Sequence, residues 1–87
     1  MEHQFITELK ARLEADKVSV RQAAIRIARA SGGRISKRTI EAACTGDIPL
    51  SFDSFLIIRE EANRFLSKKI KFDAGDFYRV KSEQHGY

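Results

Sequence analysis

Three serines mark positions where helices can begin along this chain. Ser19, Ser36 and Ser51 each stand directly before a run in which small or apolar side chains recur at helical spacing. A serine hydroxyl at the N-cap accepts a hydrogen bond from an exposed amide of the first helical turn. Gln22 follows Ser19 at the spacing of a capping box, in which the glutamine side chain reaches back to the N-cap amide. The positions of these serines predict a fold built from short helices.

Glycines lie where two of these helices can end. The SGG stretch at 31–33 follows the second expected helix, and Gly46 follows the third. Glycine lowers helix propensity and readily adopts the left-handed backbone conformation that closes many helices. The third helix is therefore expected to be short, with Ser36 as its N-cap and Gly46 as its stop.

The first and fourth expected helices are longer and supply most of the core. The first covers residues 4–16, and the fourth begins after Ser51. Their apolar side chains share one face by helical spacing. These are Phe5, Ile6, Leu9 and Leu13 in the first helix, and Phe52, Phe55, Leu56, Ile58, Ala62, Phe65 and Leu66 in the fourth. Glu60 and Glu61 diverge by about 100° on a helix, so they cannot share a proton or a metal ion, and we expect water to solvate both.

The segment 68–81 has two interpretations. KIKF and YRVK alternate like strands, while DAGD can either turn a hairpin or cap a short helix at Asp73. We favour the helix. In either case this segment is expected to cover apolar surface of the fourth helix with Phe72, Phe77, Tyr78 and Val80.

Length and composition limit the chain to one small domain, and the helix signals make it an all-α fold of four or five helices. The chain has 87 residues, of which 43% are hydrophobic and 32% charged, and it suits a single helix-rich core. We assign the core to about residues 4–67 and a C-terminal extension to 68–87. The single cysteine, Cys44, has no partner for an intramolecular disulfide, and no apolar run is long enough to cross a bilayer. A cytoplasmic protein without a membrane span is expected.

Positive charge is concentrated in the middle of the chain. Residues 17–46 hold seven basic side chains against one acidic one, a local net charge of +6, whereas the whole chain has a net charge of +4. The flanking segments are acidic or neutral overall. This distribution favours a polyanion as the partner.

The third helix has two unlike faces. At helical spacing, Ile40, Ala43 and Cys44 lie on one side of it. The other side carries Arg38, Glu41, Ala42 and Thr45, with Lys37 at its edge. The outer face of this helix is therefore expected to be thin and polar.

The order of these features resembles the lambda-repressor-like helix-turn-helix family, which includes phage repressors, Cro proteins and the XRE class of bacterial regulators. The resemblance covers roughly residues 5–67. It rests on Val18 and Ser19 before the second helix, Ala24 within it, SKRTI opening the third helix, Gly46 after it, and the PLSFDSFLII entry to the fourth.

The resemblance implies a sequence-specific regulator that binds double-stranded DNA, namely a Cro-like repressor from a phage, plasmid or bacterium. In that family the third helix enters the major groove and the second lies across the DNA backbone. The resemblance then assigns base reading to Lys37, Arg38, Glu41 and Thr45. It assigns backbone contacts to Lys17, Ser19, Arg21, Gln22, Arg34 and Ser36.

The link between the second and third helices departs from the family pattern. ARASGGRI makes this link about six residues longer than the compact family turn. Either the second helix continues up to the glycines, or the segment brings Arg34 near a phosphate or into a groove as an extra contact.

A homodimer on a palindromic operator is also expected, because one short helix reads only a few base pairs. The candidates for the dimer surface are Ile57, Phe72, Phe77 and Tyr78. We expect no catalysis, cofactor, metal ion or small-molecule substrate, since His3 and His85 lie near opposite ends and Cys44 faces inward. The rival interpretation keeps the fold but gives it an acidic protein partner, as for an antitoxin, an anti-CRISPR factor or an anti-repressor.

Overall fold

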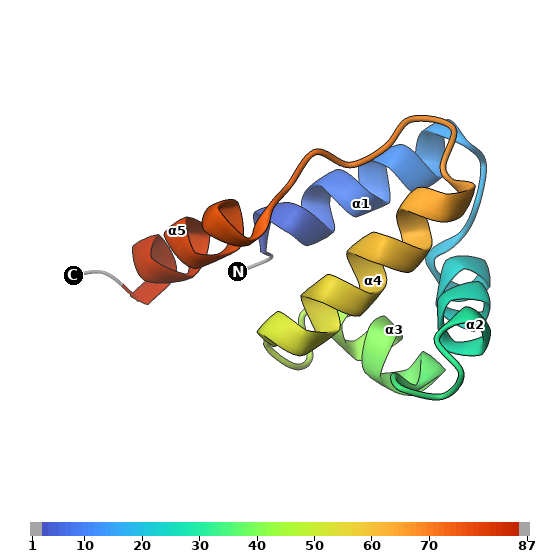
Figure 1. The fold of residues 1–87 in the computed structure, drawn as a ribbon, viewed down its shortest axis with the longest axis horizontal. Helices are drawn as coiled ribbons and strands as arrows, with labels where there is room; N and C mark the ends of the chain where they lie inside the picture. The colour runs from blue at the N-terminus through green and yellow to red at the C-terminus, as the bar shows by residue number, and fades with distance from the viewer. Residues whose placement is uncertain (1–2, 86–87) are drawn as a thin grey trace.

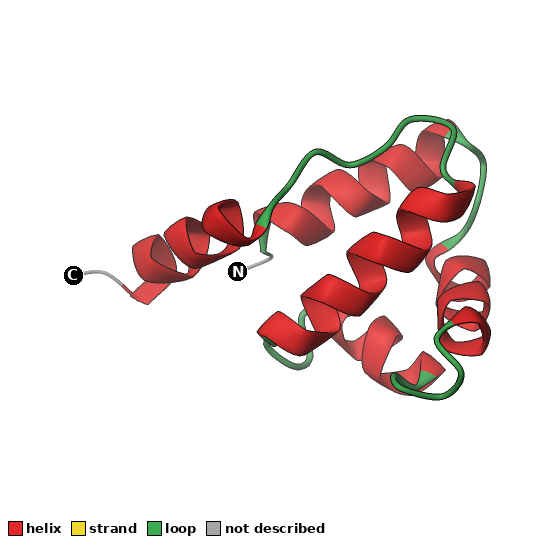
Figure 2. Cartoon of the chain, in the orientation of Figure 1, coloured by secondary structure: helices red, strands yellow, loops and turns green. Residues whose placement is uncertain are grey.

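Five helices and no strand make up the part of the chain that the structure describes (Figures 1 and 2). The structure is a computed structural model that describes residues 3–85, with side chains up to Val80. The helices are α1 Gln4–Ala15, α2 Val20–Ala30, α3 Lys37–Thr45, α4 Phe52–Phe65 and α5 Ala74–His85. The prediction of a small all-α fold is confirmed.

The serines begin the helices that they were predicted to begin. Ser19 and Gln22 form the complete capping box, with both N–H to side-chain oxygen distances at 3.0 Å. The hydroxyls of Ser36 and Ser51 accept from Thr39 and Ser54 amides at 3.1 Å. Each cap satisfies an amide that the helix itself leaves without a partner.

One continuous core holds the helices together. Its largest fully buried side chains are Phe5, Phe55 and Phe77, which come from α1, α4 and α5. Around α2 the core is made of small side chains, with Ala23 and Ala24 almost fully buried beside Ile27. Small residues allow close helix packing, and α2 packs most extensively against α3. Figure 1 shows α2 and α3 together at one end of the molecule, with α5 extending from the other.

The chain between α4 and α5 is extended and held along α4. Asn63 binds both backbone groups of Ile70, accepting from its N–H at 2.8 Å and donating to its carbonyl at 3.2 Å. Arg59 donates to the carbonyl of Phe72 at 3.1 Å. Ile70 and Phe72 are buried while Lys69 and Lys71 are exposed, so burial alternates along KIKF although this segment is not a strand and pairs with none in residues 3–85.

Asp73 begins α5, as the favoured interpretation predicted. Its side chain accepts from the amide of Asp76 at 2.8 Å, and Asp76 in return accepts from the amide of Asp73 at 3.1 Å. Phe77 is fully buried and stacks on Phe55, with ring centroids 4.9 Å apart. Tyr78, in contrast, is 57% exposed and stacks on the half-buried Phe52.

His3 belongs to the core, a role that the sequence analysis did not foresee. It is only 9% exposed, and its Nδ1 accepts from the Phe5 amide at 3.0 Å, which makes it the N-cap of α1. Its ring lies 5.0 Å from that of Phe77 and 5.8 Å from that of Phe72. The start of α1 is therefore fixed to the C-terminal extension.

Asp16 joins the end of α1 to the end of α4. Its carboxylate accepts from both the hydroxyl and the amide of Ser67, the latter at 2.9 Å. The hydrogen bond from the Ser67 hydroxyl, and to a smaller extent the one from the Ser67 amide, hold the pKa of Asp16 below its usual value. Since the folded pKa is lowered, the contribution of Asp16 to stability is complete above the unfolded pKa and is lost as pH falls through the folded one.

We predict that Asp16→Asn lowers the stability of the fold at pH 7, because the hydrogen bonds to Ser67 lose their charge. The difference from the wild type should shrink below pH about 4, where the unfolded carboxyl group is protonated. Urea unfolding of both proteins at pH 7 and pH 3 measures this. Glu14→Gln is the control, because Glu14 is an exposed carboxylate near the same helix end and forms no ion pair with any described residue. Equal stability of Asp16→Asn and wild type at pH 7 would contradict the prediction.

Candidate nucleic-acid interface

The short α3 presents a polar outer face and a buried inner one. Ile40, Ala43 and Cys44 are 1–5% exposed, as predicted for the inner face. On the outer face Arg38 and Thr45 are exposed, while Lys37, Glu41 and Ala42 are half-buried. Gly46 ends the helix in the left-handed conformation with φ 86°. Arg38 is thus the one long side chain of this face that is exposed and not half-buried.

Arg38 is not bound to any other side chain that the structure describes. In particular, no ion pair joins it to Glu41, three residues further along the same helix. Thr45 is less available, because its hydroxyl donates to the carbonyl of Ala42 at 3.1 Å. The hydroxyl oxygen of Thr45 can still accept a hydrogen bond.

The arginines of this protein fall into two groups. Five bind carboxylates or carbonyls of the chain itself, and Arg26 stacks on the ring of Phe65 at 4.2 Å; the five are Arg12, Arg34, Arg59, Arg64 and Arg79. Within the described residues, Arg21, Arg29 and Arg38 have no ion pair, hydrogen bond or ring contact of their side chains. All three are exposed, and all three lie on α2 or α3.

The outer face of α2 combines these charges with one apolar side chain. Arg21, Ile25 and Arg29 are each exposed and lie one helical turn apart, opposite the buried alanines. Ile25 is 37% exposed and borders a shallow surface pocket of about 430 Å³ that also includes Val18 and Arg26. This face can therefore bind phosphates through its arginines or a protein through Ile25.

The remaining predicted backbone-contacting residues have structural roles as well. The side chains of Ser19 and Gln22 cap α2, and that of Ser36 caps α3 while bonded to the Thr39 hydroxyl at 2.8 Å. Lys17 adopts φ 57° after α1, where its amide and that of Val18 close the helix on upstream carbonyls. The Lys17 side chain is exposed and remains available to a partner.

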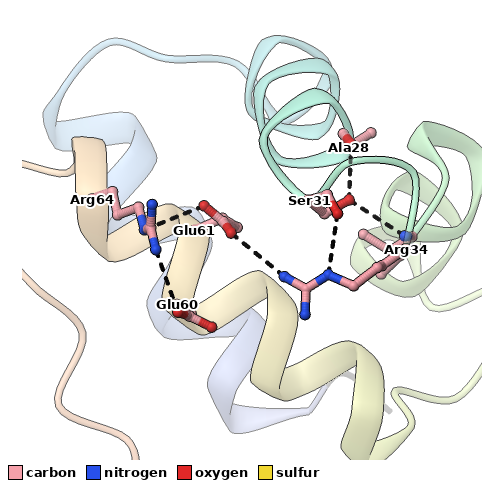
Figure 3. A network of polar contacts seen from close by, with 7 residues as sticks. Ala28, Ser31, Arg34, Glu60, Glu61 and Arg64 are labelled. Carbon is pink, nitrogen blue, oxygen red and sulfur yellow. Dashed lines mark hydrogen bonds and ion pairs between the residues drawn. The ribbon is translucent and has the colours of Figure 1, made fainter.

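The Arg34 side chain makes contacts within the chain itself. The first of the two alternatives for the long turn holds, because α2 continues to Ala30, directly before Ser31 and the glycines. The Arg34 guanidinium donates from Nε to the Ser31 carbonyl at 3.1 Å and lies 3.8 Å from Oε2 of Glu61 (Figure 3). Its side chain is 58% exposed, so part of the guanidinium still reaches the solvent.

The prediction that water solvates Glu61 is wrong. Its side chain is only 5% exposed, and it lies between Arg34 and Arg64, whose Nε is 3.4 Å from its Oε1 (Figure 3). Glu60 is exposed, as predicted. A signal was present in the sequence, since Glu61 directly precedes Ala62 and follows Ile58 by three residues, which places it on the inward stripe of α4.

Two of the four candidates for a dimer surface are inside the chain's own core. Phe72 is 7% exposed and Phe77 is 0% exposed, because both pack against His3 and Phe55. Ile57 is half-buried against the same core, which leaves Tyr78 as the exposed member of the set. As the chain is folded, a partner would therefore contact Tyr78 rather than the two phenylalanines.

Neither a metal-binding group of three ligands nor a membrane-crossing helix occurs in the described part of the chain. No three histidine, cysteine, aspartate or glutamate side chains cluster there. Within the same residues, every helix is too short or too polar to span a bilayer. No protein-family model, no curated protein and no solved structure matches this sequence or fold. The resemblance to helix-turn-helix regulators therefore rests on the residues that carry it.

Proposed function

We propose that this protein is a sequence-specific regulator that binds double-stranded DNA with α3 in the major groove and α2 along the backbone. The observation that carries the proposal is the set of exposed arginines without an internal partner, Arg21, Arg29 and Arg38, all on these two helices. Elsewhere the arginines bind carboxylates or carbonyls of the chain itself. A polyanion would supply the missing charges at α2 and α3.

The shape of α3 supports the role of the reading helix. It is nine residues long and its outer face has no bulky apolar side chain. Arg38 lies in its first turn, with a guanidinium that can donate two hydrogen bonds to the edge of a guanine. The broader proposal is a Cro-like repressor of a phage, plasmid or bacterium that acts in the cytoplasm as a homodimer on a palindromic operator.

A second candidate function is binding of an acidic protein through the outer face of α2. Ile25 favours it, because an exposed aliphatic side chain between two arginines suits the centre of a protein interface with a charged rim. Ile25 has no role in phosphate binding.

We predict that the purified protein selects a palindromic motif from a random duplex library. Two copies of α3 would read half-sites about one helical turn, or roughly 34 Å, apart. Sequencing of the bound fraction measures this. Recovery of no enriched motif at any protein concentration would reject the DNA-reading proposal and favour the acidic protein partner.

We predict a steep salt dependence of DNA binding. Each phosphate contact should contribute a slope of about −0.9 in log affinity against log salt concentration, so several arginine and lysine contacts give a strong dependence. A titration on operator duplex between low and moderate salt measures the slope. A slope near zero would mean that the charges of α2 and α3 do not bind phosphates.

We predict different effects of two arginine substitutions, Arg38→Ala and Arg21→Ala. Loss of a bidentate guanine contact costs about 1 to 3 kcal/mol of discrimination, so Arg38→Ala should weaken operator binding and leave random-DNA binding nearly unchanged. Arg21→Ala should weaken both by similar factors and make the salt slope shallower. Binding of both variants to operator and scrambled duplex measures this, and Arg79→Ala, on α5, is the charge-matched control. Full operator preference in Arg38→Ala would exclude α3 as the reading helix.

A further inference from the structure

Glu61 is a nearly buried carboxylate that connects α4 to the turn between α2 and α3. The whole residue is 4% exposed, and it belongs to neither of the outer faces of α2 and α3 that the DNA-binding proposal uses. Its two oxygens face opposite ways, Oε2 toward Arg34 at 3.8 Å and Oε1 toward Arg64 at 3.4 Å (Figure 3). A buried carboxylate is costly unless cations compensate it, so this glutamate depends on the two guanidinium groups.

The turn that Arg34 belongs to has few other attachments to the rest of the protein. It spans residues 31–36, and its two glycines have φ 67° and 88° with no side chain to pack. The Ser31 hydroxyl bonds within the turn and to Ala28, which orders the turn locally. Ser31 and Ile35 are its buried residues, and among the described residues the ion pair between Arg34 and Glu61 is the polar contact that joins the turn to α4.

We propose that Glu61 is a positioning residue for α3, acting through Arg34. Arg34 is bound at both sides of its guanidinium, to the Ser31 carbonyl at the end of α2 and to Glu61 on α4. This contact fixes the path of the turn two residues before the α3 cap, and hence the orientation in which α3 presents its outer face. The inference rests on the proposed function, and it gives Arg34 an internal role in place of a phosphate contact.

The sign of the effect on DNA binding distinguishes positioning from simple charge. Glu61→Gln removes a negative charge, which by itself raises affinity for any DNA. Positioning predicts the opposite for the operator, a loss of roughly 2- to 30-fold, with random-DNA affinity unchanged or higher. Glu60→Gln is the matched control, because Glu60 is adjacent, pairs with the same Arg64 at 3.4 Å, and is exposed. It should leave operator affinity unchanged or higher, and equal behaviour of the two variants would overturn the proposal.

Arg34→Gln tests the same contact from its exposed side, which also covers the case that Glu61→Gln does not fold. If Arg34 acts through Glu61, Arg34→Gln weakens operator binding in the wild type but adds little to Glu61→Gln. Equal weakening of operator and random-DNA binding by Arg34→Gln would instead identify a phosphate contact and overturn the proposal.

Hydrogen exchange of the turn amides tests positioning without DNA. The amide of Gly33 donates to the Ala28 carbonyl of α2 and that of Ile35 to the Ser31 hydroxyl, both in long hydrogen bonds of 3.4 Å. They should exchange faster in Glu61→Gln and Arg34→Gln than in Glu60→Gln or the wild type. Unchanged exchange in both variants would overturn the positioning role. If the wild type selects no DNA motif, the proposed function fails, and this measurement still decides whether Glu61 holds the turn.

Discussion

The aromatic cluster around Phe55 is the interaction on which the arrangement of the other elements depends. The fully buried ring of Phe55 lies 4.9 Å from those of both Phe5 and Phe77 and 5.9 Å from that of Phe72. One side chain of α4 thereby contacts α1, the extended segment and α5. Bulky rings can bridge elements that stand well apart, which is why the C-terminal extension needs no strand partner. The opposite end of the molecule uses alanines instead, and there the helices approach closely.

Because the core is divided in this way, the outer faces of α2 and α3 are not needed for packing the core. Ala23 and Ala24 are buried on the inner side of α2, which packs most extensively against α3, and the side chains of Arg21, Arg29 and Arg38 on the outer faces make no ion pair, hydrogen bond or ring contact with the described residues. Arginines elsewhere are used for structure: Arg59 holds the extended segment, and Arg34 holds the turn. Seven basic side chains in residues 17–46 repel one another, and those without an internal partner, such as Arg21, Arg29 and Arg38, suit a binding partner more than they suit stability.

Features that a helix determines by itself were predictable from the sequence, and features that depend on a distant partner were not. Ser19 and Ser36 begin their helices and Gly46 ends one, through contacts within a few residues, so local spacing was sufficient to predict these helix ends. The bond between Asp16 and Ser67 joins residues 51 positions apart, and no periodicity reports it. His3 was missed for the same reason, since its ring packs on residues of the extension. Glu61 is different, because its place on the inward stripe was visible and its charge led to the wrong expectation.

The length of the turn between α2 and α3 explains what the buried charge of Glu61 can contribute. Lengthening a loop costs little stability, since each doubling adds only about 0.6 kcal/mol of closure entropy. A longer turn nevertheless gives the next helix more orientations, and the role proposed for α3 needs a single one. An apolar anchor such as Ile35 limits the distance of the turn from the core but tolerates rotation. Arg34 adds a hydrogen bond to the Ser31 carbonyl and an ion pair with Glu61, and we infer that these two contacts together restrict the orientation that Ile35 leaves free.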